Sequence, residues 1–415
     1  MEAKTTIAPY RGAERVVILD FLRGIAIFGI LIVNMSFFNS PFFTQSGGFT
    51  LWNDMPNQIT RMFIWFFFES KFYPLFAILF GIGFYFFMQK AEDSLKPVLF
   101  RYRIRLLYLL LFGMLHVLLL WYADILVIYA LFGFVMTWFR NKSNKTLIVW
   151  AAIFLVFPII LIGALVGFLE LVKLIPEAAA GMEAGFQAQQ QYIKEMIEKT
   201  IVVYSTGSFS EIFKMRLYEY SYVLYGVIFA FPNIVSLFLI GIYIGRKKIF
   251  HDLPAGLRSL RKVFYWCLPI ALVFNTIYVY YASTGSFIMP DWDQFMMVMG
   301  SMIGGTSMMF VYLYVLAYLF HKGFFGKLAN VISKVGRMAF TNYLTQSIIC
   351  TTIFFSYGLG LYGQVNYWQG VLLAIVIYIV QVIWSHYWLK YYRFGPFEWL
   401  WRSLTYAKRQ PMKRS

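Results

Sequence analysis

The sequence is poor in charged residues and in cysteine. Charged side chains make up 13% of the 415 residues, whereas hydrophobic side chains make up 60%. A soluble domain typically carries about 25% charged residues, so the composition excludes an ordinary soluble protein. The two cysteines, Cys267 and Cys350, both lie in apolar runs. This placement indicates buried free thiols and argues against a disulfide or cysteine–metal framework.

The sequence also lacks the short motifs that mark several enzyme classes. It contains no serine nucleophile elbow, no zinc motif and no P-loop. We therefore predict no metal, and a catalytic site would have to be assembled between helices. No convincing internal repeat is present, so the inverted-repeat pattern of many transporters is also missing.

Instead, the sequence has a series of apolar runs of about twenty residues, the length that crosses a bilayer core. They predict an all-α integral membrane protein, a polytopic helix bundle of about 10 transmembrane helices. The expected spans are 16–38, 62–89, 101–121, 124–140, 146–169, 219–245, 263–283, 294–320, 336–357 and 367–390. The second span is too long for a simple crossing, which predicts a break near Ser70 and Lys71.

Three parts of the chain follow from these spans: an N-terminal helix bundle (1–169), an extracytoplasmic helical segment (170–218) and a C-terminal helix bundle (219–415). The middle part is rich in Ala, Glu, Gln and Lys, which favour helix. Its expected apolar edge consists of Phe186, Tyr192, Ile193, Met196 and Ile197. A helical cap over the outer mouth and a solvated spacer helix both fit this pattern.

The net charge of +17 is distributed unevenly along the chain. Of the 36 Lys and Arg residues, 28 lie in the two tails and in alternate loops between spans. This pattern places both termini in the cytoplasm by the positive-inside rule. It indicates contact with anionic membrane lipids and not with nucleic acid.

The first span, VVILDFLRGIAIFGILIVNM, carries Asp20, Arg23 and Asn34 on one helical stripe. Ionisable groups within spans usually face the bundle interior, so all three are candidate substrate-binding residues. The alternative is an ion pair at the helix end, with Arg23 reaching the interface. Small residues beside the stripe, including Gly24, predict close packing with a neighbouring helix.

The third span brings Arg101, Arg105 and His116 onto one face, and Asp124 follows across a short turn. Arg101 and Arg105 are candidate substrate-binding residues, about 16 Å before His116 along the helix. An Asp124–His116 pair would suit a general base, so both are catalytic candidates. The alternative is a core histidine bonded to a neighbouring backbone or hydroxyl group.

Two further polar groups are candidates for substrate binding. Lys71, with Glu69, lies at the break in the second span, where it either completes a cluster with His116 or forms an interfacial ion pair. The ninth span opens with GRMAFTNYLTQS, in which Arg337, Asn342 and Gln346 suggest a polar lining or hydrogen bonds between helices. The tail FGPFEWLWRSLTYAKR predicts an amphipathic segment on the cytoplasmic leaflet.

These motifs carry a family resemblance. ILDFLRGIAIFGILIVN, KFYPLFAILFGIGF, RLLYLLLFGMLHVLLLWYADIL and GRMAFTNYLTQS, together with GPFEWLWRSLTY, resemble the YeiB-like bacterial multi-pass membrane proteins, a domain of unknown function. More distantly, the LDxLRG opening resembles transmembrane acyltransferases of the heparan glucosaminide acetyltransferase type and bacterial membrane O-acyltransferases. That resemblance implies a cytoplasmic acyl-CoA donor, an intramembrane histidine base and an acceptor that is often a sugar. It implies that Arg23 lies near the donor's phosphates and that His116 is the base.

The leading hypothesis is therefore a transmembrane acyltransferase in the bacterial cytoplasmic (inner) membrane. It would move an acyl group from acyl-CoA to a cell-envelope glycan or a small exported acceptor. A transporter or flippase is one alternative, because polar stripes of the first and ninth spans would line a path. A non-catalytic partner or sensor that binds through 170–218 is another.

Overall fold

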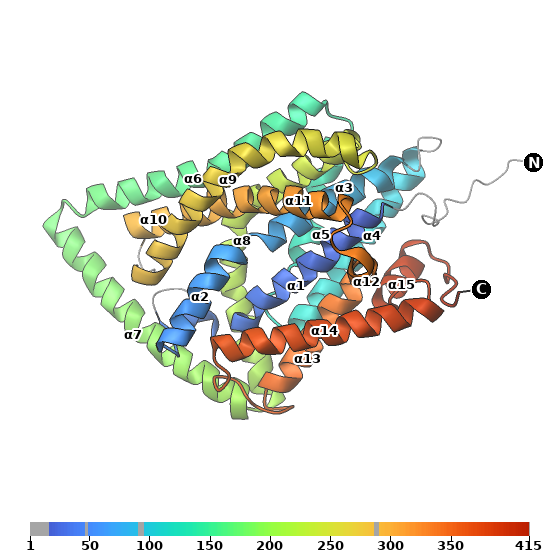
Figure 1. Cartoon of the computed structure of the whole chain (residues 1–415). Helices are drawn as coiled ribbons and strands as arrows, with labels where there is room; N and C mark the ends of the chain where they lie inside the picture. Colours follow the sequence, from blue (N-terminus) through green and yellow to red (C-terminus); the bar gives the residue numbers. More distant parts are fainter. Residues whose placement is uncertain (1–15, 46–48, 90–94, 286–289, 415) are drawn as a thin grey trace, which may run out of the picture.

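The computed structural model describes residues 16–45, 49–89, 95–285 and 290–414, which form a helical bundle without a β-strand (Figure 1). The all-α class predicted from the apolar runs is confirmed for these residues. The helices are α1 (Val17–Asn39), α2 (Met55–Phe67), α3 (Phe72–Gln89), α4 (Leu95–Leu119), α5 (Leu126–Phe139), α6 (Asn144–Val172), α7 (Pro176–Thr206), α8 (Phe209–Arg246), α9 (Leu253–Thr284), α10 (Trp292–Met299), α11 (Gly305–His321), α12 (Gly326–Arg337), α13 (Ala339–Phe354), α14 (Tyr367–Tyr391) and α15 (Pro396–Thr405), with a 3-10 helix η2 (Phe42–Gln45) and a π-helical turn η3 (Gly300–Gly304).

Within the described residues, 7 helical segments are long and apolar enough to cross a membrane, and the two halves of α8 together make up to 8. The protein is therefore a multi-pass membrane protein by the length and composition of its helices. The predicted number of ten spans is not confirmed. The other two predicted spans correspond to α5, with 14 residues, and α13, with 16, which are shorter than the roughly 20 residues of a full crossing.

Helix α1 lies at the centre of the bundle, where it packs against α3, α12, α13 and α14 (Figure 1). Its contact with α12 requires small residues on both helices. A Cβ atom on Gly336 would lie 1.8 Å from the carbonyl oxygen of Asp20, and one on Gly24 would lie 2.4 Å from that of Ile332. The close packing predicted from the small residues of the first span is therefore confirmed.

Replacing Gly336 with alanine is expected to destabilise the protein. The added methyl group cannot fit between the two backbones, so α12 must shift away from α1, and overpacking of this kind typically costs about 1–3 kcal/mol or more. The measurement is the thermal unfolding midpoint in detergent. Gly167→Ala on α6 is the matched control, because nothing lies within 4 Å of its added Cβ. An unchanged midpoint for Gly336→Ala would contradict the close contact.

The second predicted span is broken near the expected position. Helix α2 ends at Phe67 and α3 begins at Phe72, and Ser70 between them has a positive φ of 63°. Farther along α3, Gly81 of the LFGIGF stretch serves helix packing. A Cβ atom on Gly81 would lie 2.3 Å from the carbonyl oxygen of Phe238 on α8, so these helices cross in backbone contact.

Most of the predicted outer segment, 170–218, forms the long helix α7, which runs along the edge of the bundle, and its last residues begin α8 (Figure 1). Ile193, Met196 and Ile197 are buried in its contact with the bundle. Phe186 is half-buried and Tyr192 is 38% exposed, so the apolar edge is narrower than predicted. Whether α7 acts as a cap or as a spacer stays a prediction.

The GRMAFTNYLTQS segment departs from the single helix that was predicted. Helix α12 ends at Arg337 and α13 begins at Ala339, with Met338 in a non-helical conformation between them. The first turn of α13 is held by Glu398 of α15, whose carboxylate accepts hydrogen bonds from the backbone N–H groups of Phe340 (2.7 Å) and Thr341 (3.0 Å). The carboxylate therefore caps α13, because unpaired N–H groups at a helix start attract an acceptor.

The amphipathic helix predicted to lie on the cytoplasmic leaflet is α15, which packs against α4 and α13. Its buried Trp401 donates a hydrogen bond from Nε1 to the carbonyl oxygen of Arg105 at 2.9 Å. The tail is thus an integral part of the bundle through its apolar face. The sequence predicted an amphipathic segment on the cytoplasmic leaflet, but it did not predict that this segment packs against α4 and α13.

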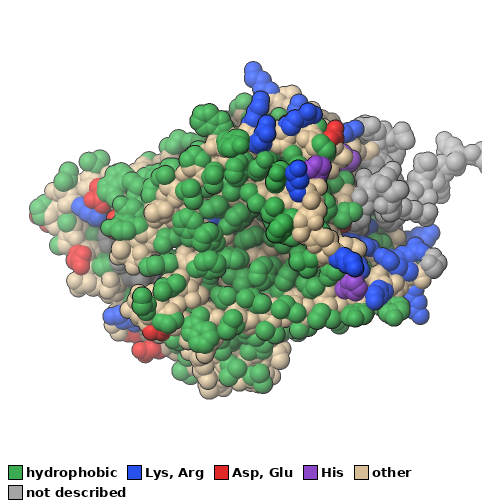
Figure 2. All heavy atoms as spheres, viewed as in Figure 1, with side chains coloured by type: hydrophobic (Ala, Val, Ile, Leu, Met, Phe, Trp, Pro, Cys, Tyr) green, Lys and Arg blue, Asp and Glu red, His purple; other side chains and the backbone are tan. Residues whose placement is uncertain are grey.

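Charged residues are segregated on the surface. Figure 2 shows Lys and Arg side chains mainly in two groups, one at the top of the view and one at the right near the C-terminus, and hydrophobic side chains over the broad middle. This distribution fits a protein whose middle faces lipid and whose basic groups face one side of the membrane. The N-terminal tail, 1–15, lies outside the described residues.

Candidate functional site

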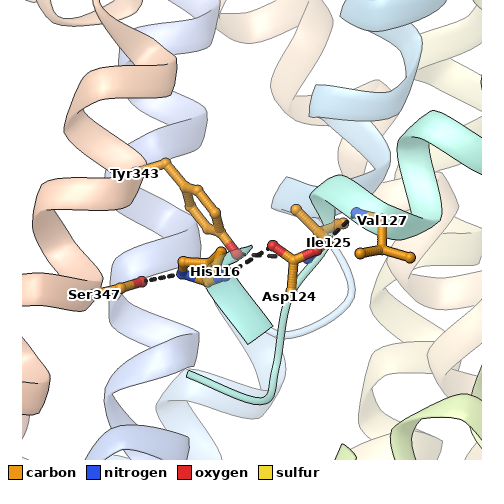
Figure 3. A network of polar contacts seen from close by, with 6 residues as sticks. All are labelled: His116, Asp124, Ile125, Val127, Tyr343 and Ser347. Carbon is orange, nitrogen blue, oxygen red and sulfur yellow. Dashed lines mark hydrogen bonds and ion pairs between the residues drawn. The ribbon is translucent and has the colours of Figure 1, made fainter. Parts of the chain in front are cut away.

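A buried polar network surrounds His116, near the end of α4 (Figure 3). Its ring Nε2 lies 2.8 Å from Oγ of Ser347, and its Nδ1 lies 2.8 Å from Oδ1 of Asp124. His116, Asp124 and Ser347 are all at most 2% exposed. The Nδ1–Oδ1 contact has the distance of an ion pair but not the alignment of a full hydrogen bond. The predicted pairing of Asp124 with His116 is present.

Asp124 is held by the start of α5. Its second carboxylate oxygen, Oδ2, accepts a hydrogen bond from the backbone N–H of Val127 at 2.7 Å. The phenol of Tyr343 points toward the same carboxylate and accepts a hydrogen bond from the backbone N–H of Ile125 at 3.4 Å (Figure 3). The turn between α4 and α5 thus fixes the carboxylate beside the imidazole.

Helix α13 supplies the other side of the site. Tyr343 and Ser347 are four residues apart, so they lie on one helical face, and this face meets His116. Gly113, one turn before His116 on α4, leaves the space in which the start of α5 and the carboxylate of Asp124 approach α4. A Cβ atom there would lie 2.6 Å from the backbone nitrogen of Val127 and 3.1 Å from Oδ2 of Asp124.

This arrangement favours one protonation pattern. An aspartate beside Nδ1 stabilises the tautomer with a proton on Nδ1, which leaves Nε2 to accept the hydrogen bond of the Ser347 hydroxyl. Asp124, His116 and Ser347 then stand in the order of a carboxylate, a base and a hydroxyl nucleophile. Such a network can deprotonate a hydroxyl group for acyl transfer.

None of the described contacts of the arginines predicted to bind substrate is with this network. Nη1 of Arg23 donates to Oδ1 of Asp20 at 2.8 Å, so that predicted pair is present. The guanidinium of Arg105 lies 3.8 Å from the ring centre of Trp401 and within electrostatic range of Arg23. Arg101 lies 5.8 Å from the ring centre of Tyr406. Arg23 and Arg105 therefore lie within electrostatic range of each other, and Trp401 of α15 packs against Arg105.

Other predicted binding residues lie in different surroundings. Asn34 is half-buried on α1. Lys71 is buried, donates to the carbonyl oxygen of Trp65 at 2.6 Å and lies over the ring of Tyr278. The structure therefore places Lys71 in a cluster with α2 and α9, and none of its described contacts is with His116.

The predicted residues of the GRMAFTNYLTQS motif face α14 and the C-terminal segment. Asn342 donates to Oγ of Ser385 at 3.0 Å, and Gln346 donates to Oε1 of Gln381 at 2.9 Å. Arg337 contacts the carbonyl oxygen of Arg393 at 3.4 Å. These contacts match the alternative of hydrogen bonds between helices, and substrate binding by the three residues stays a prediction.

Sequence reasoning missed three residues of the site: Gly113, Tyr343 and Ser347. Each lies inside a quoted motif. The spacing of Tyr343 and Ser347 shows that they share a helical face, but the neighbouring sequence does not show which helix this face contacts.

Among the described residues, no group of three His, Cys, Asp or Glu side chains is placed to hold a metal ion.

Together, the long apolar helices and the buried Asp–His–Ser network define a multi-pass helical membrane protein with a polar site inside its bundle. The chain belongs to the YeiB-like family of bacterial proteins of unknown function. Residues 244–408 match the family model described as "Protein of unknown function (DUF418)". The matched range contains Ser347 but not His116.

Two relatives match over nearly their whole length. The uncharacterized protein YxaH of Bacillus subtilis (strain 168) is 34% identical over 427 residues, which cover 99% of each chain. The uncharacterized protein YeiB of Escherichia coli (strain K12) is 29% identical over 411 residues, 94% of this chain and 96% of the relative. No solved structure matches the chain.

Proposed function

We propose that the protein is a membrane acyltransferase that moves an acyl group from acyl-CoA to a cell-envelope glycan or a small exported acceptor. The observation that carries this proposal is the chain of contacts from Asp124 through His116 to Ser347, with 2.8 Å at each step. A buried imidazole between a carboxylate and a hydroxyl group is an arrangement that can activate the hydroxyl group for acyl transfer.

The proposed reaction has two steps. Oγ of Ser347 attacks the thioester carbonyl carbon while Nε2 of His116 takes its proton. The carbon–sulfur bond then breaks, and the thiolate of CoA leaves with that proton. In the second step the acceptor's hydroxyl or amine attacks the acyl-serine ester, His116 takes the acceptor's proton and returns it to Ser347, and the acylated acceptor leaves.

The burial of these side chains bears on both steps. Exclusion of bulk water protects the acyl-serine ester from hydrolysis and strengthens the electrostatic effect of Asp124 on the imidazole. Both substrates have to reach buried atoms, so the proposal includes a rearrangement of the side chains around His116 during turnover.

Arg23, Arg101 and Arg105 would bind the phosphates of the donor, because arginine forms charge-assisted hydrogen bonds with phosphate oxygens. Arg105 precedes His116 by about 16 Å along α4, a distance that an extended pantetheine arm can span. The pairing of Arg23 with Asp20 and its proximity to Arg105 support a shared binding region.

We place the protein in the bacterial cytoplasmic membrane with both termini in the cytoplasm. The two basic groups on the surface (Figure 2) support this orientation, and the bacterial relatives support this membrane. Trp401 of α15 packs against Arg105, and Arg23 of α1 lies within electrostatic range of the same guanidinium.

Purified protein in lipid nanodiscs is expected to become labelled by radioactive acetyl-CoA. Without an acceptor, the acyl group stays on the protein as an ester. The measurement is protein-bound radioactivity after denaturation, with release by hydroxylamine as the check for an ester. Protein given free radioactive acetate is the control.

The absence of both labelling and CoA binding would overturn the proposal. Uptake of a substrate into proteoliposomes without acyl-CoA, collapsing with the proton gradient, would favour a transporter instead.

A further inference from the structure

Arg216 on α8 is a buried cation whose donor groups are only partly used. The residue is fully buried, at 0% exposure. Its Nη1 donates to the carbonyl oxygen of Leu118 at 2.6 Å, near the end of α4 and two residues beyond His116. Its Nε and Nη2 have no hydrogen-bond partner among the described residues.

No described carboxylate makes an ion pair with Arg216. Glu219 lies three residues farther along α8 and within electrostatic range. Both of its oxygens are bound elsewhere: Oε1 accepts from the backbone N–H of Phe42 at 3.2 Å, and Oε2 accepts from the hydroxyl of Tyr204 at 2.6 Å. Burial of a charge without a countercharge in contact is unfavourable, so its presence here points to a function.

The two unused donors form a fork. In a guanidinium group, the N–H of Nε and one N–H of Nη2 point to the same side, at the spacing of two oxygens of a carboxylate or phosphate. The bond from Nη1 to Leu118 holds the group in place while that side stays without a partner. Bidentate binding of an anion needs this fixed geometry.

Other donors lie around the same region. Tyr362 is buried, its hydroxyl has no described partner, and its ring packs 4.8 Å from that of Tyr204. Nε1 of Trp121, three residues after Leu118, is likewise buried without a partner. Tyr204 lies within electrostatic range of Arg216, so Tyr362 belongs to the same buried polar region.

Arg246 at the other end of α8 shows what a purely structural arginine looks like. Its Nη1 donates to the carbonyl oxygen of Lys142 at 2.6 Å, and its Nη2 donates to that of Arg140 at 2.6 Å. It thus ties α8 to the end of α5. If Arg216 only tied α8 to the end of α4, its donors would be expected to be used in the same way.

We propose that Arg216 binds a carboxylate or phosphate group of a ligand, next to the end of α4 that carries His116. As part of the proposed function, this group belongs to the acceptor, which makes the acceptor an anionic molecule. That role rests on the acyltransferase proposal. Anion binding itself does not depend on it.

The test is ligand-dependent thermal unfolding of the full chain in zwitterionic nanodiscs, without acyl-CoA. Glycerol 3-phosphate and succinate are the soluble anionic probes, and glycerol is the neutral one. A second arm uses nanodiscs that contain phosphatidic acid, to distinguish a lipid headgroup from a soluble anion. A probe at about 100 times its Kd is expected to raise the midpoint by about 5 °C.

The variants are Arg216→Gln, Arg216→Lys and the matched control Arg246→Gln. We expect Arg246→Gln to keep the anion-dependent shift and both Arg216 variants to lose it, because lysine keeps the charge without the fork. The unliganded midpoint of each variant shows that it is folded. No shift for any anion in the wild type, or an equal shift in Arg216→Gln, would overturn the proposal. A failure of acetyl-CoA labelling would leave this result unaffected.

Discussion

Replacing His116 with alanine is expected to lower acyl transfer by about 10²–10⁴-fold, the usual contribution of a general base. The alanine variant cannot take the proton of Ser347, so attack on the thioester slows. The measurement is the initial rate of protein labelling from radioactive acetyl-CoA. Thermal unfolding of the variant, compared with the wild type, shows whether the bundle remains folded.

Asp124→Asn separates the charge of Asp124 from its structural role. Asparagine can still accept the hydrogen bond from Val127, so the turn before α5 is retained. The variant loses the negative charge that favours a proton on Nδ1, and labelling should fall as for His116→Ala. His386→Ala on α14 is the control and is expected to label normally. Normal labelling by a folded His116→Ala variant would refute the assignment of the base.

The pairing of His116 with Asp124 could be predicted because it is local. The two residues are separated by one short turn, and the end of an apolar run marks where that turn begins. The break at Ser70 was predictable for a similar reason, since a run that is too long to cross must bend or break. Predictions of this kind need only chain length and helical geometry.

The contact between His116 and Ser347 could not be predicted, because 231 residues separate them in the chain. Helical spacing shows that Tyr343 and Ser347 share a face, and that Asn342 and Gln346 share the neighbouring one. It does not show which face meets α4 and which meets α14. Asn342 and Gln346, the predicted binding residues, lie on the second face, and their amides bond to α14.

The burial of the charged side chain of Arg216 could not be predicted from the sequence either. In the sequence it is one of the few Lys and Arg residues in the predicted outer segment, where a solvated side chain is the ordinary expectation. Its burial arises only because α8 packs against the end of α4, where Leu118 accepts its hydrogen bond. Likewise, the amphipathic pattern of α15 shows an apolar face without showing that Trp401 packs against Arg105.

Replacing Ser347 with alanine is expected to abolish covalent labelling and to lower turnover by at least about 10²-fold. The variant lacks the oxygen that would carry the acyl group, whereas His116 and Asp124 remain in place. Ser236→Ala is the matched control, because Ser236 is also fully buried and its hydroxyl donates to the carbonyl oxygen of Ala151 at 2.7 Å. Intact-mass measurement after exposure to acetyl-CoA reports the loss or retention of the added acyl group.

The double variant His116→Ala/Ser347→Ala tests whether the two residues act in one step. Residues that act as a unit are strongly non-additive, so the double variant should be about as slow as the slower single variant. Additive losses would mean that His116 and Ser347 contribute independently. Full turnover by Ser347→Ala together with a slow His116→Ala would show that His116 activates the acceptor directly. The acyl-serine step would then be wrong, while acyl transfer with His116 as the base would stand.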